Sequence, residues 1–185
     1  VREYLAPGVM LYETQAQDAA LEADETELVV RCLAFTAAAL WMLGYPEQAR
    51  QRSAQASAFA RQDGRPSVLA LALYLGCWVH QDRRDIPATK THVETLLALA
   101  REYELPFWLT WGQTYQGWTL MEQGEVTEGI RYIQDSLSIL QAAGAEGGFS
   151  DTLTFLAEAY AKNGQLQKSS ELLEQALTVI ADNGE

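Results

Sequence analysis

The chain has 185 residues, 48% of them hydrophobic, which is enough for a core of its own. Its 25 acidic and 13 basic residues give a net charge of −12. This excess of negative charge argues against nucleic acid or an anionic membrane surface as a partner.

The sequence also argues against insertion in a membrane. The longest apolar stretch, residues 32–44, is shorter than the roughly 20 residues that a spanning helix needs. Because the chain opens with Val-Arg-Glu, without a signal peptide or an initiating Met, we interpret it as part of a longer, cytoplasmic protein. Cys32 and Cys77 have neither metal-type spacing nor a disulfide framework, which fits a reducing compartment.

The first distinct segment in the chain is acidic. Residues 13–27 contain six carboxylate side chains and no basic residue. A run of this kind is usually a solvated face or connector, and a docking strip for a basic partner is the alternative.

From residue 28 onward, a turn sequence returns every 40 residues without a gap. Its copies are LGYPEQA (43–49), RRDIPAT (83–89), QGEVTEG (123–129) and NGQLQKS (163–169). Seven residues before the turn position of Gly44 and its equivalents lies a small residue in every copy, namely Ala37, Cys77, Gly117 and Ala157. Twenty residues after it lie Gly64, Glu104, Gly144 and Gly184, where helices are expected to end in left-handed caps. A period of this length indicates a repeat architecture.

Between these markers the apolar residues recur at spacings of three and four, as in amphipathic helices. ELLEQALTVIA (171–181) is the clearest case. We predict that each repeat is a helix, the turn, a second helix and a capping loop. The predicted repeats are 28–66, 67–106, 107–147 and 148–185, preceded by a partial repeat and its acidic connector at 1–27.

The combination of a small residue, a glycine turn and a second small residue, as in Ala37, Gly44 and Ala49, resembles the tetratricopeptide (TPR) repeat. AEAYAKNGQLQKSSELLEQAL (157–177) matches that pattern best. The resemblance covers about residues 28–184, with residues 1–12 similar to the second helix of a preceding unit. It departs from the pattern at Arg84 and Thr89, where the family has glycine and alanine. The resemblance implies an all-α, right-handed α-solenoid of helix pairs, with helices longer than those of the usual repeat of about 34 residues.

A narrower resemblance rests on three stretches, residues 39–53, 108–130 and 156–165. They are similar to the C-terminal helical region of bacterial multidomain regulators. Those proteins carry an ATPase module, often with a class III adenylate or guanylate cyclase or a DNA-binding activator domain. The resemblance implies that this chain is a regulatory module of a larger bacterial signalling protein.

The sequence contains no recognisable catalytic motif. It has no phosphate-binding loop, no HExxH zinc motif and no GxSxG nucleophile elbow. Cys77 and His80 share one helix face, but no orienting carboxylate or oxyanion device accompanies them. We therefore predict no catalytic residue, no metal site and no cofactor.

The resemblance places a binding groove on the first helices of the pairs. In the TPR family these helices line the concave face at spacings of three, seven and ten residues. Four of the five tryptophans fall on these positions. The predicted groove residues are Arg31, Trp41, Tyr74, Trp78, Trp111, Trp118, Met121 and Glu158. Since Trp and Tyr dominate binding hot spots, we expect a peptide or protein segment as partner, including another domain of the same polypeptide.

Other interpretations stay open. The aromatic rings could instead pack on the next repeat, which would make the chain a structural or oligomerisation scaffold. A small-effector sensor would need a pocket near Trp78, Trp111 and Trp118. The last helix has an apolar face that could form a homodimer.

Overall fold

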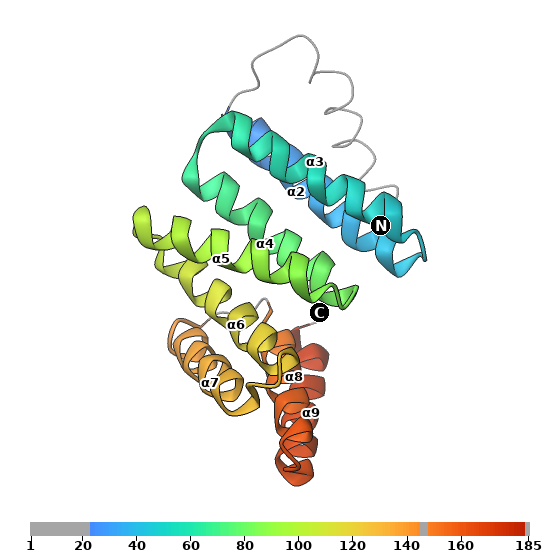
Figure 1. Ribbon diagram of the computed structural model, residues 1–185, viewed down its shortest axis with the longest axis vertical. Helices are drawn as coiled ribbons and strands as arrows, with labels where there is room; N and C mark the ends of the chain where they lie inside the picture. Colours follow the sequence, from blue (N-terminus) through green and yellow to red (C-terminus); the bar gives the residue numbers. More distant parts are fainter. Residues whose placement is uncertain (1–22, 145–147, 184–185) are drawn as a thin grey trace. The chain divides into compact units, whose positions relative to one another are not determined.

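The computed structural model describes residues 23–144 and 148–183, and expectations for residues 1–22 and for Gly184 lie outside them. These residues form eight helices and no strand (Figure 1), so the prediction of an all-α fold built from helix pairs is confirmed. The helices are α2 (Ala23–Met42), α3 (Pro46–Asp63), α4 (Pro66–Asp82), α5 (Ile86–Glu102), α6 (Pro106–Glu122), α7 (Val126–Ala142), α8 (Phe149–Lys162) and α9 (Leu166–Asn183). None of these helices combines the length and the apolar character needed to cross a membrane.

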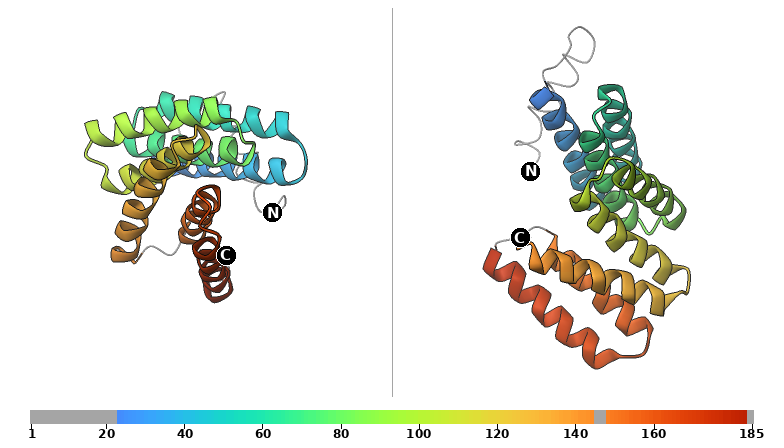
Figure 2. Two further views of the ribbon diagram at one scale, coloured as in Figure 1. Left: turned by 60° about the horizontal axis from the view of Figure 1, so that its bottom comes forward. Right: turned by 90° about the vertical axis from the view of Figure 1, so that its left-hand side faces the viewer.

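The chain divides into two compact units, Val1–Trp108 and Leu109–Glu185. The first unit contains α2 to α5 and the opening residues of α6. The second contains the rest of α6 and α7 to α9. Within each unit, the helices of a pair lie alongside one another, and Figure 2 shows the same pairs from two further sides.

Proline and a carboxylate define where several helices begin. α3, α4 and α5 each have a proline in the first two positions, where a missing amide proton costs no hydrogen bond. Asp85 caps α5 by accepting a hydrogen bond from the Ala88 amide at 3.2 Å.

The first helix of every pair ends in the same turn. The residues at the turn position have positive φ angles, namely Gly44 (81°), Arg84 (54°), Gly124 (92°) and Gly164 (75°). In the first copy, the amide of Gly44 donates to the carbonyl of Trp41 at 2.9 Å, and that of Tyr45 donates to Leu40 at 2.8 Å. This Schellman pattern recurs in the other three copies. Arg84 therefore adopts the glycine conformation although it is not glycine.

The second helices end in the same way, as the period predicts. Gly64 and Gly144 have φ angles of 79° and 63°, and Glu104 has 51°. A left-handed backbone costs an L-residue other than glycine roughly 1–2 kcal/mol. Arg84 and Glu104 are thus the two described places where the repeat geometry imposes strain on the local sequence.

The helices α6 and α7 approach each other closely where each carries a glycine. At α6 and α7, a Cβ atom added to Gly117 would lie 2.8 Å from the carbonyl oxygen of Gly129, and one added to Gly129 would lie 2.6 Å from that of Gly117. The equivalent residues in the other pairs are also small and buried, namely Ala37 with Ala49, Cys77 with Thr89, and Ala157 with Ser169. The period therefore places two small, buried residues at the same point of each pair.

Aliphatic side chains fill the space between consecutive pairs in the first unit. Val29, Val30 and Leu33 of α2 pack in one cluster with Leu71 and Leu75 of α4. Ala56 and Ala60 of α3 belong to the same cluster, so both helices of the first pair contact the second pair.

Replacing Glu104 by glycine should stabilise the protein. Glycine adopts a positive φ without steric cost, so we expect the free energy of unfolding to rise by about 0.5–1 kcal/mol. Glu102→Gly is the matched control, because it removes the same charge from the last residue of α5 and should lower stability by up to about 1 kcal/mol. Urea unfolding followed by circular dichroism measures both, and an equal loss in the two variants would contradict the strain at Glu104.

Replacing Gly117 by alanine should destabilise the protein, although alanine is the better helix former. The new methyl group would meet backbone atoms of α7, so the helices must separate, at a cost of about 1–3 kcal/mol. Ser138→Ala on the exposed side of α7 is the control and should change stability by less than about 0.5 kcal/mol. A Gly117→Ala protein as stable as the parent would show that the close approach is not a constraint.

Candidate functional site

The structure places the eight predicted groove residues in different environments. Trp111, Trp118 and Met121 of the second unit are buried. Trp41, Tyr74 and Trp78 of the first unit are half-buried. Arg31 is exposed and Glu158 is half-buried. Whether any of them contacts a partner stays a prediction, but only part of the set offers surface.

The buried rings join α6 to α8. The Trp118 ring lies with its centre 6.5 Å from that of Phe155, and Tyr115 lies 5.6 Å from the same phenylalanine in an edge-to-face arrangement. The Trp111 ring lies against Gly148, where an added Cβ atom would come within 2.5 Å of it. These contacts support the packing interpretation for Trp111 and Trp118.

The half-buried rings lie on α2 and α4, two helices in contact. Trp78 packs against two apolar clusters, one around Leu33 and Leu75 and one around Ala37 and Val79. Trp41 packs against the second of these clusters, and Tyr74 against the first. Each ring therefore packs against the core and is only partly exposed, and the Tyr74 ring also contacts that of Trp108, with the ring centres 5.8 Å apart. We call Trp41, Tyr74 and Trp78 the aromatic face.

Phe35 is an addition to this region that the period did not predict. Its equivalents Leu75, Tyr115 and Phe155 are buried, whereas Phe35 is exposed and meets the edge of the Trp78 ring at 6.1 Å. Leu75 packs on α2, which belongs to the preceding pair. The corresponding neighbours of Phe35 would come before Ala23, outside the described residues. The sequence signal that could have indicated the exposure of Phe35 was its position in the first described pair.

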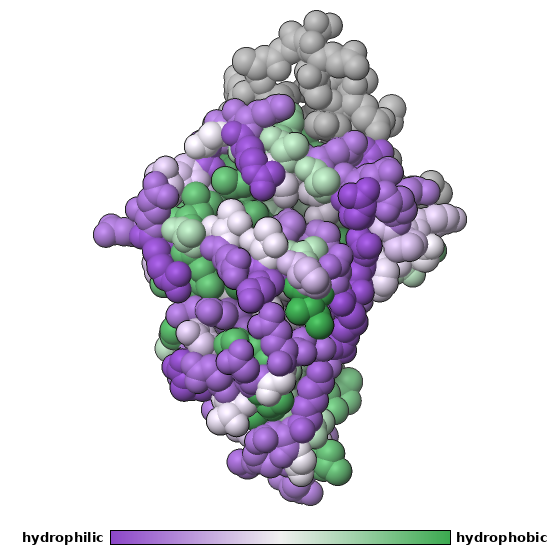
Figure 3. Space-filling model, in the orientation of Figure 1, coloured by the Kyte–Doolittle hydropathy of each residue, from purple (hydrophilic) through white to green (hydrophobic). Residues whose placement is uncertain are grey.

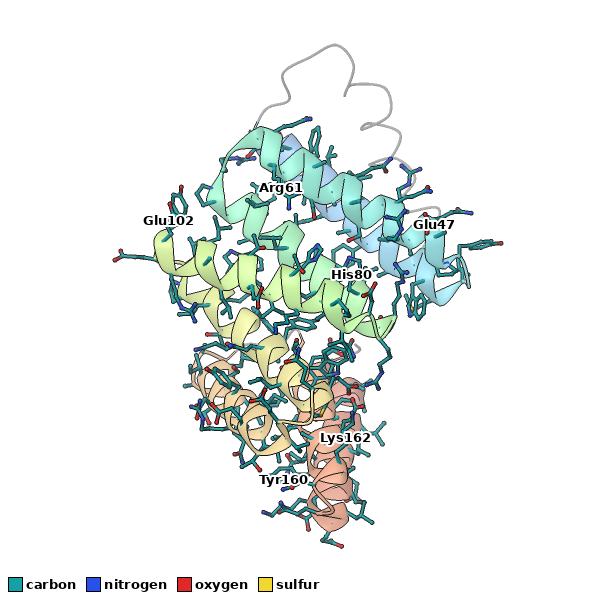
Figure 4. All side chains as sticks on the ribbon, in the orientation of Figure 1. Glu47, Arg61, His80, Glu102, Tyr160 and Lys162 are labelled. Carbon is teal, nitrogen blue, oxygen red and sulfur yellow. The ribbon has the colours of Figure 1, made fainter. Side chains whose placement is uncertain are left out.

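The charged members of the predicted set make local ion pairs. Arg31 bonds to Glu27 one turn earlier on α2, at 2.8 Å. Lys162 lies 3.9 Å from Glu158 on α8 and 2.5 Å from Glu122 on α6. Figure 4 labels Lys162 near the end of α8. The Arg31–Glu27 pair is exposed and contributes little to stability, whereas Glu122 and Glu158 are half-buried in the pairs with Lys162.

The two histidines lie together between α4 and α5. The His80 ring, labelled in Figure 4, has its centre 4.8 Å from that of His92. His92 donates from Nδ1 to the carbonyl of Ala88 at 3.0 Å, and its ring occupies the space beside Gly76. The Nδ1 atom of His80 makes no hydrogen bond and lies 4.0 Å from Asp85.

The environment of this cluster keeps its groups uncharged. Burial, followed by the proximity of His92, lowers the pKa of His80 to about 4. Burial also lowers the pKa of His92 and raises that of the Cys77 thiol. A thiol held in its neutral form is a poor nucleophile. Among the described residues, no group of three or more His, Cys, Asp or Glu side chains is arranged to hold a metal ion.

Comparison with known proteins bears on the fold. No protein-family model matches the chain, and no curated protein matches it by sequence. A crystal structure of a Podosopora anserina putative kinesin light chain with nearly identical TPR-like repeats superposes with a TM-score of 0.62 at 19% identity. That alignment covers 99% of this chain and 88% of the other.

Two further crystal structures are similar to this chain at comparable TM-scores. BtubC (BKLC) from P. vanneervenii aligns over 97% of this chain and 91% of its own, with a TM-score of 0.63 and 13% identity. Aspartyl phosphate phosphatase F from Bacillus subtilis aligns over 95% of this chain and 54% of its own, with a TM-score of 0.65 and 13% identity. At these identities the similarity establishes the fold alone, which is that of TPR-like helical repeat proteins.

The buried histidines predict a loss of stability in mild acid. Their folded-state pKa values lie below the usual 6.5, so the unfolded chain binds more protons. For His80 the stabilisation is complete above pH 6.5 and is lost as the pH falls toward 4, by at most about 1.4 kcal/mol per pH unit. The lowered pKa of His92 acts in the same direction.

His80→Leu, which introduces the residue found at Leu40 and Leu120, should flatten this dependence. Urea unfolding at pH 7 and pH 5 measures the pH dependence of stability. Arginine partners lower the pKa values of Glu47 and Asp63, so both carboxylates stay ionised over this pH range and do not contribute to the difference. An unchanged difference between the two pH values in His80→Leu would exclude His80 as its source.

Proposed function

We propose that this chain is a non-catalytic protein-interaction module that holds a peptide or protein segment against its aromatic face. The observation that carries the proposal is the set of half-buried rings on α2 and α4, Trp41, Tyr74 and Trp78. TPR-like structural neighbours favour an interaction role over a catalytic one.

The aromatic face has the physical properties of a binding surface. Its rings are fixed from below by the core, so little side-chain entropy is lost when a ligand covers them. Trp and Tyr rings bring large apolar areas to an interface and often supply its hot spots. Arg31, the basic member of the predicted groove residues, forms an ion pair with Glu27. We therefore infer a ligand that binds through apolar or aromatic side chains, with weak dependence on salt.

In this proposal the remaining predicted residues have supporting roles. Trp111, Trp118 and Met121 maintain the packing of the second unit. Glu158 and its neighbour Glu122, which is paired with Lys162, contribute negative charge. The chain has a net charge of −12, which favours a neutral or basic segment as ligand and disfavours nucleic acid.

The proposal for the larger protein that contains this module is based on the sequence resemblance. We infer that it belongs to a larger bacterial cytoplasmic signalling protein with ATPase and cyclase or DNA-binding domains. In such a protein, another domain of the same polypeptide is as suitable a ligand as a separate protein.

The scaffold alternative is supported by one observation, the burial of Trp111 and Trp118. If other parts of the full-length protein also bury the rings of the first unit, the chain acts as a spacer between domains and binds no ligand. Homodimerisation through the last helix would belong to the same alternative.

The aromatic face can be tested with peptides selected from a random library on the immobilised chain. Trp41→Ala should weaken binding of the selected peptides about tenfold or more, as expected for a hot-spot ring. Trp78→Ala should do the same if circular dichroism shows it folded. Isothermal titration calorimetry measures the affinities.

Tyr103→Ala is the matched control, because Tyr103 is an exposed aromatic residue at the end of α5, outside the aromatic face. It should leave affinity unchanged. Selected peptides that bind the Trp41→Ala protein as tightly as the parent would place the binding site outside the aromatic face and overturn this proposal.

A further inference from the structure

Gln81 is a buried polar residue on the side of α4 that carries two rings of the aromatic face. It lies in the last turn of the helix, directly after His80, which is labelled in Figure 4. Gln81 follows Tyr74 by seven residues and Trp78 by three, so the three positions share one face of the helix. The residue is only 7% exposed. Its position therefore belongs with the aromatic face, although the structure leaves little of it open.

The side-chain amide of Gln81 has no hydrogen-bond partner among the described residues. Its backbone carbonyl is bonded, because it accepts from the amide of Arg84 at 2.8 Å. The amide atoms of the side chain are not among the unbonded atoms that are closed to solvent, so a ligand can reach them. Buried amides are usually bonded, since an unpaired one has given up its hydrogen bonds to water. Gln81 therefore has unused hydrogen-bonding capacity at the aromatic face.

Comparison along the period shows that packing does not require an amide at this position. The residues 40 positions away in either direction, and the next one along, are Trp41, Met121 and Ala161. Met121 resembles glutamine in length and shape and is 2% exposed in its own unit. An apolar side chain of the same length thus fills the equivalent place in the fold. Glutamine at position 81 adds a polar group that the fold itself does not use.

Apolar contact alone does not specify a ligand for this molecule. On the face shown in Figure 3, hydrophobic residues form small areas separated by hydrophilic ones. A ligand that covers one such area also covers polar groups, and each covered polar group costs free energy unless it is bonded. The partner of the Gln81 amide is therefore part of what defines the ligand.

The main chain of an extended peptide fits this amide. A glutamine side chain presents N–H donors and a carbonyl acceptor next to each other, and a peptide group presents the complementary carbonyl and N–H. In an α-helix these backbone groups are already bonded within the helix. In an extended segment they are free to bond a neighbour. The backbone of a helical ligand, or an apolar small molecule, would instead cover the amide without bonding it.

A second folded copy of this chain does not supply such a segment. Its described residues lie in eight helices joined by short turns and include no strand. The net charge of −12 on each copy also opposes their association. The extended ligand is therefore a segment that lies outside the folded repeats.

We propose that Gln81 binds the main chain of an extended peptide through a pair of hydrogen bonds, while Trp41 and Trp78 contact side chains of the same peptide. This inference rests on the proposed function and specifies the conformation of the ligand at the aromatic face. Side chains alternate between two sides of an extended chain, so those that meet the rings are two residues apart.

Gln81→Met tests the inference with the peptides selected on the immobilised chain. Methionine keeps the length of the side chain and removes an unpaired amide, so the free energy of unfolding in urea should be no lower than that of the parent. We expect the affinity for the peptides to fall about tenfold or more, measured by isothermal titration calorimetry. If circular dichroism shows that Gln81→Met has lost its fold, Gln81→Ala takes its place, with the residue found at Ala161.

Gln116→Met is the matched control. Gln116 on α6 is half-buried, and its amide oxygen is also unbonded among the described residues, but that oxygen is closed to solvent. The same substitution there removes an amide that a ligand does not reach. It should alter the affinity less than about twofold.

A double-mutant cycle tests the contact with the main chain. Peptides are made in which one backbone N–H at a time is replaced by an ester oxygen, which removes the donor and leaves the side chains unchanged. At one position we expect about a tenfold loss with the parent chain and less than a twofold loss with Gln81→Met, because the bond is already absent there. An equal loss in the two proteins at every position would overturn the pairing.

The outcomes separate this inference from the proposed function. Peptides that bind Trp41→Ala weakly but Gln81→Met as tightly as the parent would leave the aromatic face as the binding site and overturn the role of Gln81. Peptides that bind both variants like the parent would overturn the proposed function as well. Selected peptides with apolar residues at spacings of three and four, and helical when bound by circular dichroism, would overturn the extended conformation.

Discussion

The placement of two small, buried residues at the same point of each helix pair is the constraint on which the rest of the structure depends. At Gly117 and Gly129 the two backbones are so near that neither position has room for a methyl group. This contact fixes the distance and the rotation of the second helix relative to the first. The helix faces that are not used inside the pair then either pack against the next pair or stay exposed to solvent.

The turns keep this contact in register. Every first helix ends in a left-handed residue followed by the same hydrogen bonds, so the second helix always starts from the same point. The geometry is strong enough to hold Arg84 and Glu104 in a conformation that suits glycine. Tertiary packing therefore decides these two backbone angles, against the local preference of the residues.

The fold could be predicted from the sequence because its determinants repeat along the chain. The spacing of Ala37, Cys77, Gly117 and Ala157 gave the helix pairs, and the glycines gave their ends. The exposure of the candidate site could not be obtained in this way. Trp78 and Trp118 occupy the same position in the period, yet Trp118 is buried beside Phe155 while Trp78 stays half-open. A period states which helix face a residue is on, but not how large its neighbours in the adjoining pairs are.

The unbroken spacing of 40 residues also restricts how such a chain can change length during evolution. Duplicating or deleting one whole repeat leaves every small-residue contact and every left-handed turn in place. Inserting a single residue inside a helix would rotate all that follows in it by about 100° and turn its buried face toward solvent. Small changes in length are thus confined to the connections between pairs, while the number of pairs is free to vary.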